Sequence, residues 1–182
     1  DYFDSNPEVS GKMYCRGGGF LDSSDFRIDE FEPSFFSISP KEAIALDPQQ
    51  RMLLEVSWEA LEQSGLDPSK LMKSKTGVFL WISSNDYMGL LKDSVQRGEL
   101  ETHLITGNIA STAAGRLSYT YGFEGPALSV DTACSSSLVS IHLALQSLRE
   151  GSSDLALAAG VNALISPDGF ECFSRLRALS PT

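Results

Sequence analysis

The chain has 182 residues, of which 42% are hydrophobic, and it carries a formal net charge of -10. This length allows one domain with a substantial core, and the negative charge argues against general affinity for nucleic acid. No apolar run is long enough to span a bilayer, and no secretory signal opens the sequence. The three cysteines are too far apart for a disulfide framework or a metal site, which favours a reducing, cytoplasmic setting.

The N-terminal half predicts irregular structure followed by two helices. Residues 1–35 are rich in Gly, Ser, Asp and Phe and lack periodicity. Ser39-Pro40-Lys41-Glu42 is a capping box that predicts one helix, and Asp47-Pro48-Gln49-Gln50 predicts a second that ends near Gly65. The second helix carries an apolar stripe that indicates core packing and no ligand site. Its members are Leu53, Leu54, Val56, Trp58, Ala60 and Leu61.

The remaining sequence alternates between strand and helix patterns. Residues 76–82 form a continuous apolar run, typical of a strand buried on both faces of a parallel sheet. Residues 83–86 offer caps for a helix that reaches to about Gly98. Further predicted elements are a helix around 111–118, a strand over 127–131, a helix over 138–148 and a strand over 155–165. The alternation indicates an α/β layer structure with a parallel or mixed sheet.

Cys134 lies between a predicted strand and a long predicted helix. A helix start presents unpaired N–H groups and the positive end of the helix dipole, which favours the nucleophilic thiolate. The same N–H groups are suited to hold a developing oxyanion. The position therefore predicts covalent acyl chemistry at Cys134. Cys15 and Cys172 lack such a position and are expected to be small buried hydrophobes.

The helix after Cys134 is apolar on all sides, which predicts that it is buried and that Cys134 lies at the base of a pocket. His142 is on this helix, about 12 Å along the axis from Cys134, and is therefore out of hydrogen-bond reach. We expect His142 to pack in the core and His103 to lie at the surface.

The segment Asp131-Thr132-Ala133-Cys134-Ser135-Ser136-Ser137-Leu138 resembles the active-site motif of β-ketoacyl synthases from modular polyketide synthases and animal-type fatty acid synthases. Four further blocks fit the same family in the same order: residues 35–43, 46–62, 111–119 and 153–162. The resemblance implies that residues 1–182 are a partial β-ketoacyl synthase domain with a thiolase-like, layered α/β/α fold. It also implies one more strand before Asp1 and a further half-domain after Thr182.

The resemblance implies a function in two steps. Cys134 takes an acyl group from a carrier-protein thioester, and the carbanion from decarboxylation of a malonyl-type thioester then attacks the acyl-enzyme. No bound cofactor is implied, because the phosphopantetheine arm belongs to the acyl carrier protein. Other implied partners are neighbouring domains such as an acyltransferase and a second copy of the chain, with residues 127–130 and 109–119 near the two-fold axis. The two family histidines lie in motifs that have no counterpart here, so the chain alone is expected to be inactive.

Two alternatives come from other classes of protein. A cysteine hydrolase with a nucleophile elbow requires Gly two residues before and after the nucleophile, and Thr132 and Ser136 occupy those positions. A non-catalytic ketosynthase-like partner that shapes chain length or assembly is opposed by the retention of Cys134. The sequence leaves open whether the pathway makes polyketides or fatty acids.

Overall fold

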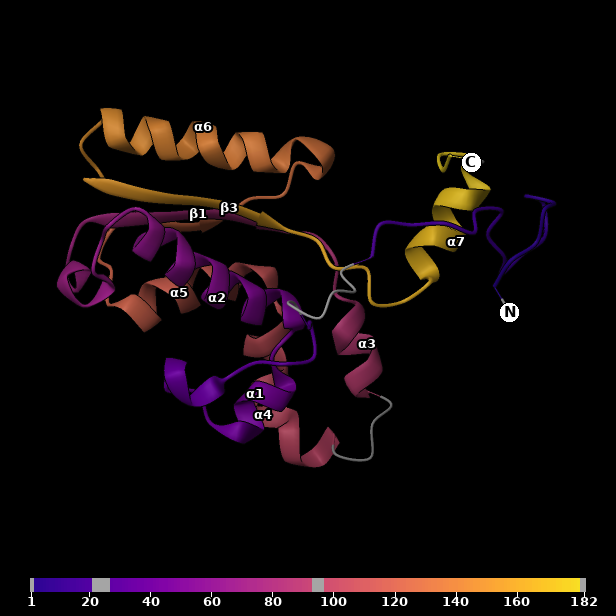
Figure 1. Cartoon of the computed structure of the whole chain (residues 1–182), viewed down its shortest axis with the longest axis horizontal. Helices are drawn as coiled ribbons and strands as arrows, with labels where there is room; N and C mark the ends of the chain where they lie inside the picture. The colour runs from indigo at the N-terminus through magenta and orange to yellow at the C-terminus, as the bar shows by residue number, and fades with distance from the viewer. Residues whose placement is uncertain (1, 21–26, 93–96, 181–182) are drawn as a thin grey trace. The chain divides into compact units, whose positions relative to one another are not determined.

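The computed structural model describes residues 2–20, 27–92 and 97–180. The chain divides into two compact units. One unit comprises residues 29–163 and holds the sheet with most of the helices (Figure 1). The other comprises residues 1–28 together with 164–182.

The larger unit is built on a parallel sheet with the strand order β2-β1-β3. The central strand β1 (Thr76–Ile82) is buried almost throughout, as its continuous apolar run predicts. It pairs in parallel with β2 (Ala127–Ser129) on one side and with β3 (Leu155–Val161) on the other. All three predicted strands are confirmed, although β2 and β3 end earlier than the sequence suggested.

Helices cover both faces of this sheet (Figure 1). The helices α2 (Pro48–Gln63) and α5 (Ala110–Tyr121) lie on one face, and α6 (Ser136–Arg149) lies on the other. The main core forms between β1 and the first pair of helices. Its members include Leu54, Leu61, Val78, Leu80 and Leu117. These three layers confirm the predicted α/β/α arrangement.

The predicted helix starts are present with their capping bonds. Ser39 accepts the Glu42 N–H at 3.2 Å before α1 (Pro40–Ala45). Asp47 accepts the Gln49 N–H at 2.8 Å before α2. Gly65, with a φ of 70°, follows the end of α2 as expected. The apolar stripe of α2 is narrower than predicted, because Val56 and Ala60 are exposed.

The segment after β1 forms more helices than the sequence suggested. The helices α3 (Asp86–Lys92) and α4 (Arg97–Asn108) replace the single helix expected to reach Gly98, and part of that expected helix, residues 93–96, lies outside the described residues. Extended backbone at Ile109 separates α4 from α5. Short 3-10 helices η1 (Pro33–Phe36) and η2 (Pro68–Leu71) complete the connections.

The small residues of α5 pack partly within the chain itself. Ala113 and Ala114 are 2% and 0% exposed and belong to the main core. This burial within one chain does not test whether the block lies near a two-fold axis, which stays a prediction. The small side chains of Ala113 and Ala114 let α5 approach β1 and β2, which it contacts.

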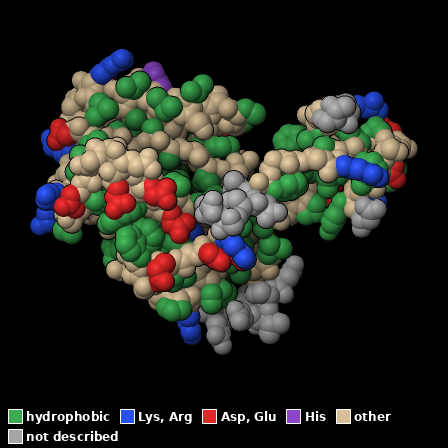
Figure 2. Space-filling view, viewed as in Figure 1, with side chains coloured by type: hydrophobic (Ala, Val, Ile, Leu, Met, Phe, Trp, Pro, Cys, Tyr) green, Lys and Arg blue, Asp and Glu red, His purple; other side chains and the backbone are tan. Residues whose placement is uncertain are grey.

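The helix α6 is not buried on all sides, contrary to prediction. Its sheet-facing residues are small and buried: Ser136, Ser140, Ala144 and Ser147. Its large apolar residues are exposed, with Leu138 at 73% and Ile141 at 46%. Figure 2 shows hydrophobic side chains along the upper edge of the larger unit, where α6 lies. The sheet covers only one face of α6. The apolar side chains on its other faces are therefore exposed, although the helix is apolar on all sides.

The smaller unit contains α7 (Asp168–Arg175) and an irregular N-terminal segment. Tyr14 ties the two together, because its N–H donates to Ser174 Oγ at 3.0 Å and its hydroxyl donates to the Leu179 carbonyl at 2.7 Å. Within the described ranges, no helix has the length and apolar character that crossing a membrane requires.

Candidate functional site

The turn that carries Cys134 comprises residues 131–136 and is called here the Cys134 turn. It begins where the sheet ends, since the Val130 N–H donates to the Leu80 carbonyl at 2.8 Å just beyond β2. The 3-10 helix η3 (Ala133–Ser135) follows, and α6 starts at Ser136. Cys134 therefore lies at the carboxyl edge of a parallel sheet and before a long helix, as predicted. This edge is where open α/β sheets bind their ligands.

The backbone of the Cys134 turn is strained next to the cysteine. Ala133 has a φ of 55°, a left-handed conformation that is unfavourable for a residue with a Cβ. Its N–H donates to Asp131 Oδ1 at 2.9 Å, and its carbonyl accepts the Ser136 hydroxyl at 2.6 Å. Hydrogen bonds to the N–H and to the carbonyl of Ala133 thus hold this residue in its left-handed conformation. They also fix the direction of the backbone at Cys134.

Hydroxyl groups tie the rest of the turn together. The Thr132 N–H donates to Ser136 Oγ at 2.7 Å. The Ser135 hydroxyl donates to the Thr132 carbonyl at 2.9 Å. The side chain of Ser135, the N-cap residue of α6, makes no capping hydrogen bond to the helix. The first N–H groups of α6 are thus left without a side-chain cap at the end nearest Cys134.

Cys134 is exposed, so the prediction that it lies at the base of a pocket is wrong for the chain as described. His142 is also exposed, contrary to the expectation that it packs in the core, and His103 on α4 is partly buried. Cys172 is exposed and Cys15 is partly buried, so the expectation that both are buried is wrong as well.

Among the described residues, each unit has a hollow of about 690 Å³. The hollow in the smaller unit is largely apolar, and Cys15 is among its lining residues. The hollow in the larger unit is lined by aromatic residues of η1, α2 and α5 and by Arg116. Cys134 is not among the residues that line the hollow in the larger unit.

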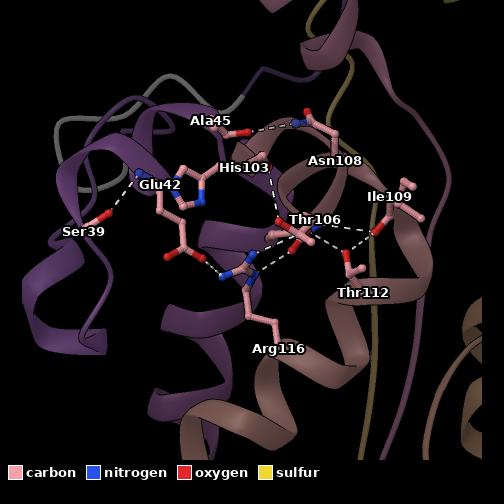
Figure 3. Close-up of polar contacts among 10 residues, drawn as sticks. Ser39, Glu42, Ala45, His103, Thr106, Asn108, Ile109, Thr112 and Arg116 are labelled. Atoms are coloured by element: carbon pink, nitrogen blue, oxygen red, sulfur yellow. Dashed lines mark hydrogen bonds and ion pairs between the residues drawn. The ribbon is translucent and has the colours of Figure 1, made fainter. Parts of the chain in front are cut away.

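Arg116 is the centre of a polar cluster that sequence reasoning did not single out (Figure 3). Its guanidinium donates to Glu42 Oε1 at 2.6 Å and to Gln50 Oε1 at 3.0 Å. Figure 3 shows its side chain reaching from α5 toward Glu42 on α1 and the carbonyl of Thr106 on α4. These partners belong to α2, α1 and α4, so Arg116 joins three helices to α5.

Burial raises the pKa of several side chains in the helix layer, among them Asp47 and Tyr121. The pKa of Asp47 is raised, chiefly because its carboxylate is removed from water, although it accepts hydrogen bonds from Gln49. Burial likewise raises the pKa of Tyr121, whose hydroxyl lies 2.9 Å from that of Ser57. Both groups lie in the helix layer and have structural roles. Within the part of the chain that the structure describes, no cluster of His, Cys, Asp or Glu suits a metal ion.

Comparison with known proteins identifies the family. The family model described as "Beta-ketoacyl synthase, N-terminal domain" matches residues 1–182. The chain belongs to the β-ketoacyl synthase family. Among curated β-ketoacyl synthase relatives, the pikromycin polyketide synthase component PikAII of Streptomyces venezuelae is 52% identical over 98% of the chain. The mycoketide-CoA synthase of Mycobacterium tuberculosis is 52% identical over 98% of the chain. The chain spans only 5% and 4% of these two proteins.

Solved ketosynthases share the fold. A cysteine-to-serine mutant of the module 6 ketosynthase of the Bacillus subtilis bacillaene synthase matches 99% of the chain, with a TM-score of 0.84 and 37% identity. The oxazolomycin ketosynthase domain OzmH KS7 of Streptomyces albus matches 96%, with a TM-score of 0.82 and 34% identity. The chain covers 28% and 29% of these two structures. These matches confirm the predicted thiolase-like fold, of which the chain forms a part.

The site residues missed by sequence reasoning are Trp81 and Asp131. The sequence pattern indicates only an apolar strand at Trp81 and a family motif at Asp131. The structure joins them, because Trp81 Nε1 donates to Asp131 Oδ1 at 3.2 Å. A tryptophan near the carboxyl end of a buried strand was the available signal, since its indole N–H usually requires a partner when the ring is buried.

Proposed function

We propose that the chain is the cysteine-bearing part of a polyketide synthase ketosynthase, and that Cys134 is its acyl-accepting nucleophile. The observation that carries this proposal is the exposed Cys134 thiol, held between the carboxyl edge of the sheet and the start of α6. The relatives are polyketide synthases, which favours that pathway over fatty acid synthesis.

The first proposed step is acyl transfer to Cys134. The thiolate attacks the carbonyl carbon of an acyl thioester carried on the phosphopantetheine of an acyl carrier protein. A new C–S bond forms to Cys134, the old C–S bond breaks, and the carrier thiolate leaves and takes up a proton. The transient oxyanion is held by the Cys134 N–H, in a part of the chain where N–H groups cluster before α6.

The second proposed step is condensation. A malonyl-type thioester loses CO₂, and the electron pair left behind attacks the acyl carbon on Cys134. The new C–C bond lengthens the acyl chain by two carbons, and the Cys134 thiolate departs. His142 and His103 lie on α6 and α4, outside the Cys134 turn. We therefore propose that the groups that assist decarboxylation come from the rest of the protein and that residues 1–182 alone do not condense.

The proposed partners are an acyl carrier protein, neighbouring domains such as an acyltransferase, and a second copy of the chain. No cofactor of the domain's own is proposed, since phosphopantetheine arrives with the carrier. The dimer proposal rests on β2, which is an edge strand of the described sheet. Its Leu128 is 47% exposed. An exposed strand edge is a ready template for pairing with another chain.

Acylation is tested in the full-length protein with a simple acyl thioester, followed by mass spectrometry of the cysteine peptides. We expect label on Cys134, loss of label in Cys134→Ser, and normal labelling in the matched variants Cys15→Ser and Cys172→Ser. Label that persists in Cys134→Ser would contradict the proposal. A malonyl-type thioester is then added. An active ketosynthase forms a ketoacyl product, whereas a non-catalytic ketosynthase-like partner forms none.

A further inference from the structure

We propose that Trp81 is a positioning residue for Cys134. Through the carboxylate of Asp131, the indole N–H of Trp81 fixes the left-handed turn at Ala133 that directs the thiol. This inference rests on the proposed acyl transfer at Cys134. It assigns a role to a residue that lies 53 positions before the cysteine and in a different element.

The link consists of two hydrogen bonds to one oxygen atom. Asp131 Oδ1 accepts Trp81 Nε1 at 3.2 Å and the Ala133 N–H at 2.9 Å. The hydroxyl of Ser136 lies 3.5 Å from the same oxygen. A carboxylate that accepts several N–H bonds is oriented by all of them, and each bond to a charged acceptor is stronger than a neutral one. Trp81 therefore determines where the acceptor for Ala133 sits.

The indole of Trp81 lies beside the backbone of β3. Trp81 and Gly160 are paired across β1 and β3, and a Cβ at Gly160 would come 3.5 Å from Trp81 Cε3. The same Cβ would collide with the hydroxyl of Ser137, in the first turn of α6. The ring of Trp81 thus lies beside the bare backbone of Gly160, on the α6 side of the sheet. This placement near the start of α6 lets the indole N–H reach Asp131.

Asp131, in contrast, is exposed. Water competes for an exposed carboxylate, so without the Trp81 N–H its side chain has other orientations available. The bond from Ala133 would then be made only part of the time, and the unfavourable left-handed φ of Ala133 would lose support. The sheet core is on the other side of β1, so this change loosens the Cys134 turn without unfolding the unit.

The test uses the full-length protein and a matched pair of substitutions, Trp81→Phe and Trp58→Phe. The chain has two tryptophans, so both variants make the same chemical change. Trp58 belongs to an aromatic cluster with Phe35 and Tyr121. We expect Trp81→Phe to slow acylation of Cys134 by about fivefold to tenfold, the size of one typical hydrogen bond. Trp58→Phe should leave this rate within about twofold.

Equal acylation rates in the two variants would overturn the proposal. If the wild-type protein is not acylated at all, it is the proposed function that fails. The positioning role is then still tested by the rate at which iodoacetamide alkylates Cys134 across pH. We expect the pH profile of that rate to shift in Trp81→Phe and to be unchanged in Trp58→Phe, whereas coincident profiles would overturn the proposal.

A second, independent arm uses Asp131. Alkylation rates are measured for Trp81→Phe, Asp131→Ala and the double variant. Because both residues act through one oxygen, the double variant should be no slower than Asp131→Ala alone. Independent, multiplicative effects would overturn the link.

Discussion

Gln49 Oε1 accepts the N–H of Ala163 at 3.0 Å, although the two residues are 114 positions apart. The amide nitrogen of the same side chain donates to the Ser84 carbonyl at 3.1 Å. Ser84 follows β1 and Ala163 follows β3, so one fully buried side chain at the start of α2 joins the exits of two neighbouring strands. Both polar atoms of the Gln49 amide are used, since Oε1 accepts one hydrogen bond and Nε2 donates the other.

We expect Gln49→Glu to lower the free energy of unfolding by about 2–4 kcal/mol, because it buries a charge and removes the donor to Ser84. The matched control is Gln63→Glu, an exposed glutamine on the same helix, which should change the free energy by about 0.5 kcal/mol or less. Urea unfolding of both variants measures the difference. Equal effects would show that the two bonds of Gln49 contribute little.

The close approach of β3 to α6 gives a second prediction. A Cβ at Gly160 meets the hydroxyl of Ser137, so Gly160→Ala should lower stability by about 1–3 kcal/mol through overpacking. Ser137→Ala removes the obstructing oxygen. We therefore expect the double variant to regain most of the loss, as measured by denaturant unfolding of the two single variants and the double. Strictly additive losses would mean that the contact is not the cause.

Several features were predictable from sequence because their causes are local. The caps at Ser39 and Asp47 depend on residues two or three positions away, and the burial of β1 follows from its own composition. The roles of Gln49 and Trp81 depend on partners 114 and 50 positions away, which no periodic pattern encodes. The exposed face of α6 was missed for a related reason, since composition shows that α6 is apolar but not which of its faces is covered.

Asp47 should make the stability of the chain depend on pH. Burial raises its pKa in the folded state, so the folded state holds the proton more tightly than the unfolded state. The stability of the wild type therefore falls as pH rises from about 4, the unfolded pKa, through the folded pKa. Asp47→Asn keeps the helix cap and cannot ionise. We expect its stability relative to wild type to increase from pH 4 to pH 7, as measured by urea unfolding at each pH.

The control for this experiment is Asp47→Ala, which removes both the charge and the cap. It should be less stable than Asp47→Asn by about 1 kcal/mol at every pH, because the bond to the Gln49 N–H is lost. Other shifted carboxyls, such as Glu8 with its lowered pKa, are shared by all three proteins and cancel in the differences. A constant difference between Asp47→Asn and wild type across pH would contradict the role of Asp47.

The two faces of α6 should differ in how strongly a change of side-chain size affects stability. Ala144 is 6% exposed and faces the sheet, so Ala144→Leu should destabilise the 182-residue chain by about 1–3 kcal/mol. Leu145 is 44% exposed, and Leu145→Ala should lose about 1 kcal/mol or less. A larger loss on Leu145→Ala would indicate that the face is covered by self-association, which sedimentation of the same sample would detect.

The uncovered side chains of α6 also have a calorimetric consequence. The heat capacity change of unfolding scales with the apolar surface that unfolding exposes to water. It is about 12–15 cal/mol/K per residue for ordinary domains. Four apolar side chains of α6 are already exposed to water in the folded chain: Leu138, Ile141, Leu145 and Leu148. Their removal from water by any covering partner would therefore appear as a negative heat capacity change on binding. The same partner would raise the heat capacity change measured on unfolding, so calorimetry can report the covering of α6 without any assay of the thiol.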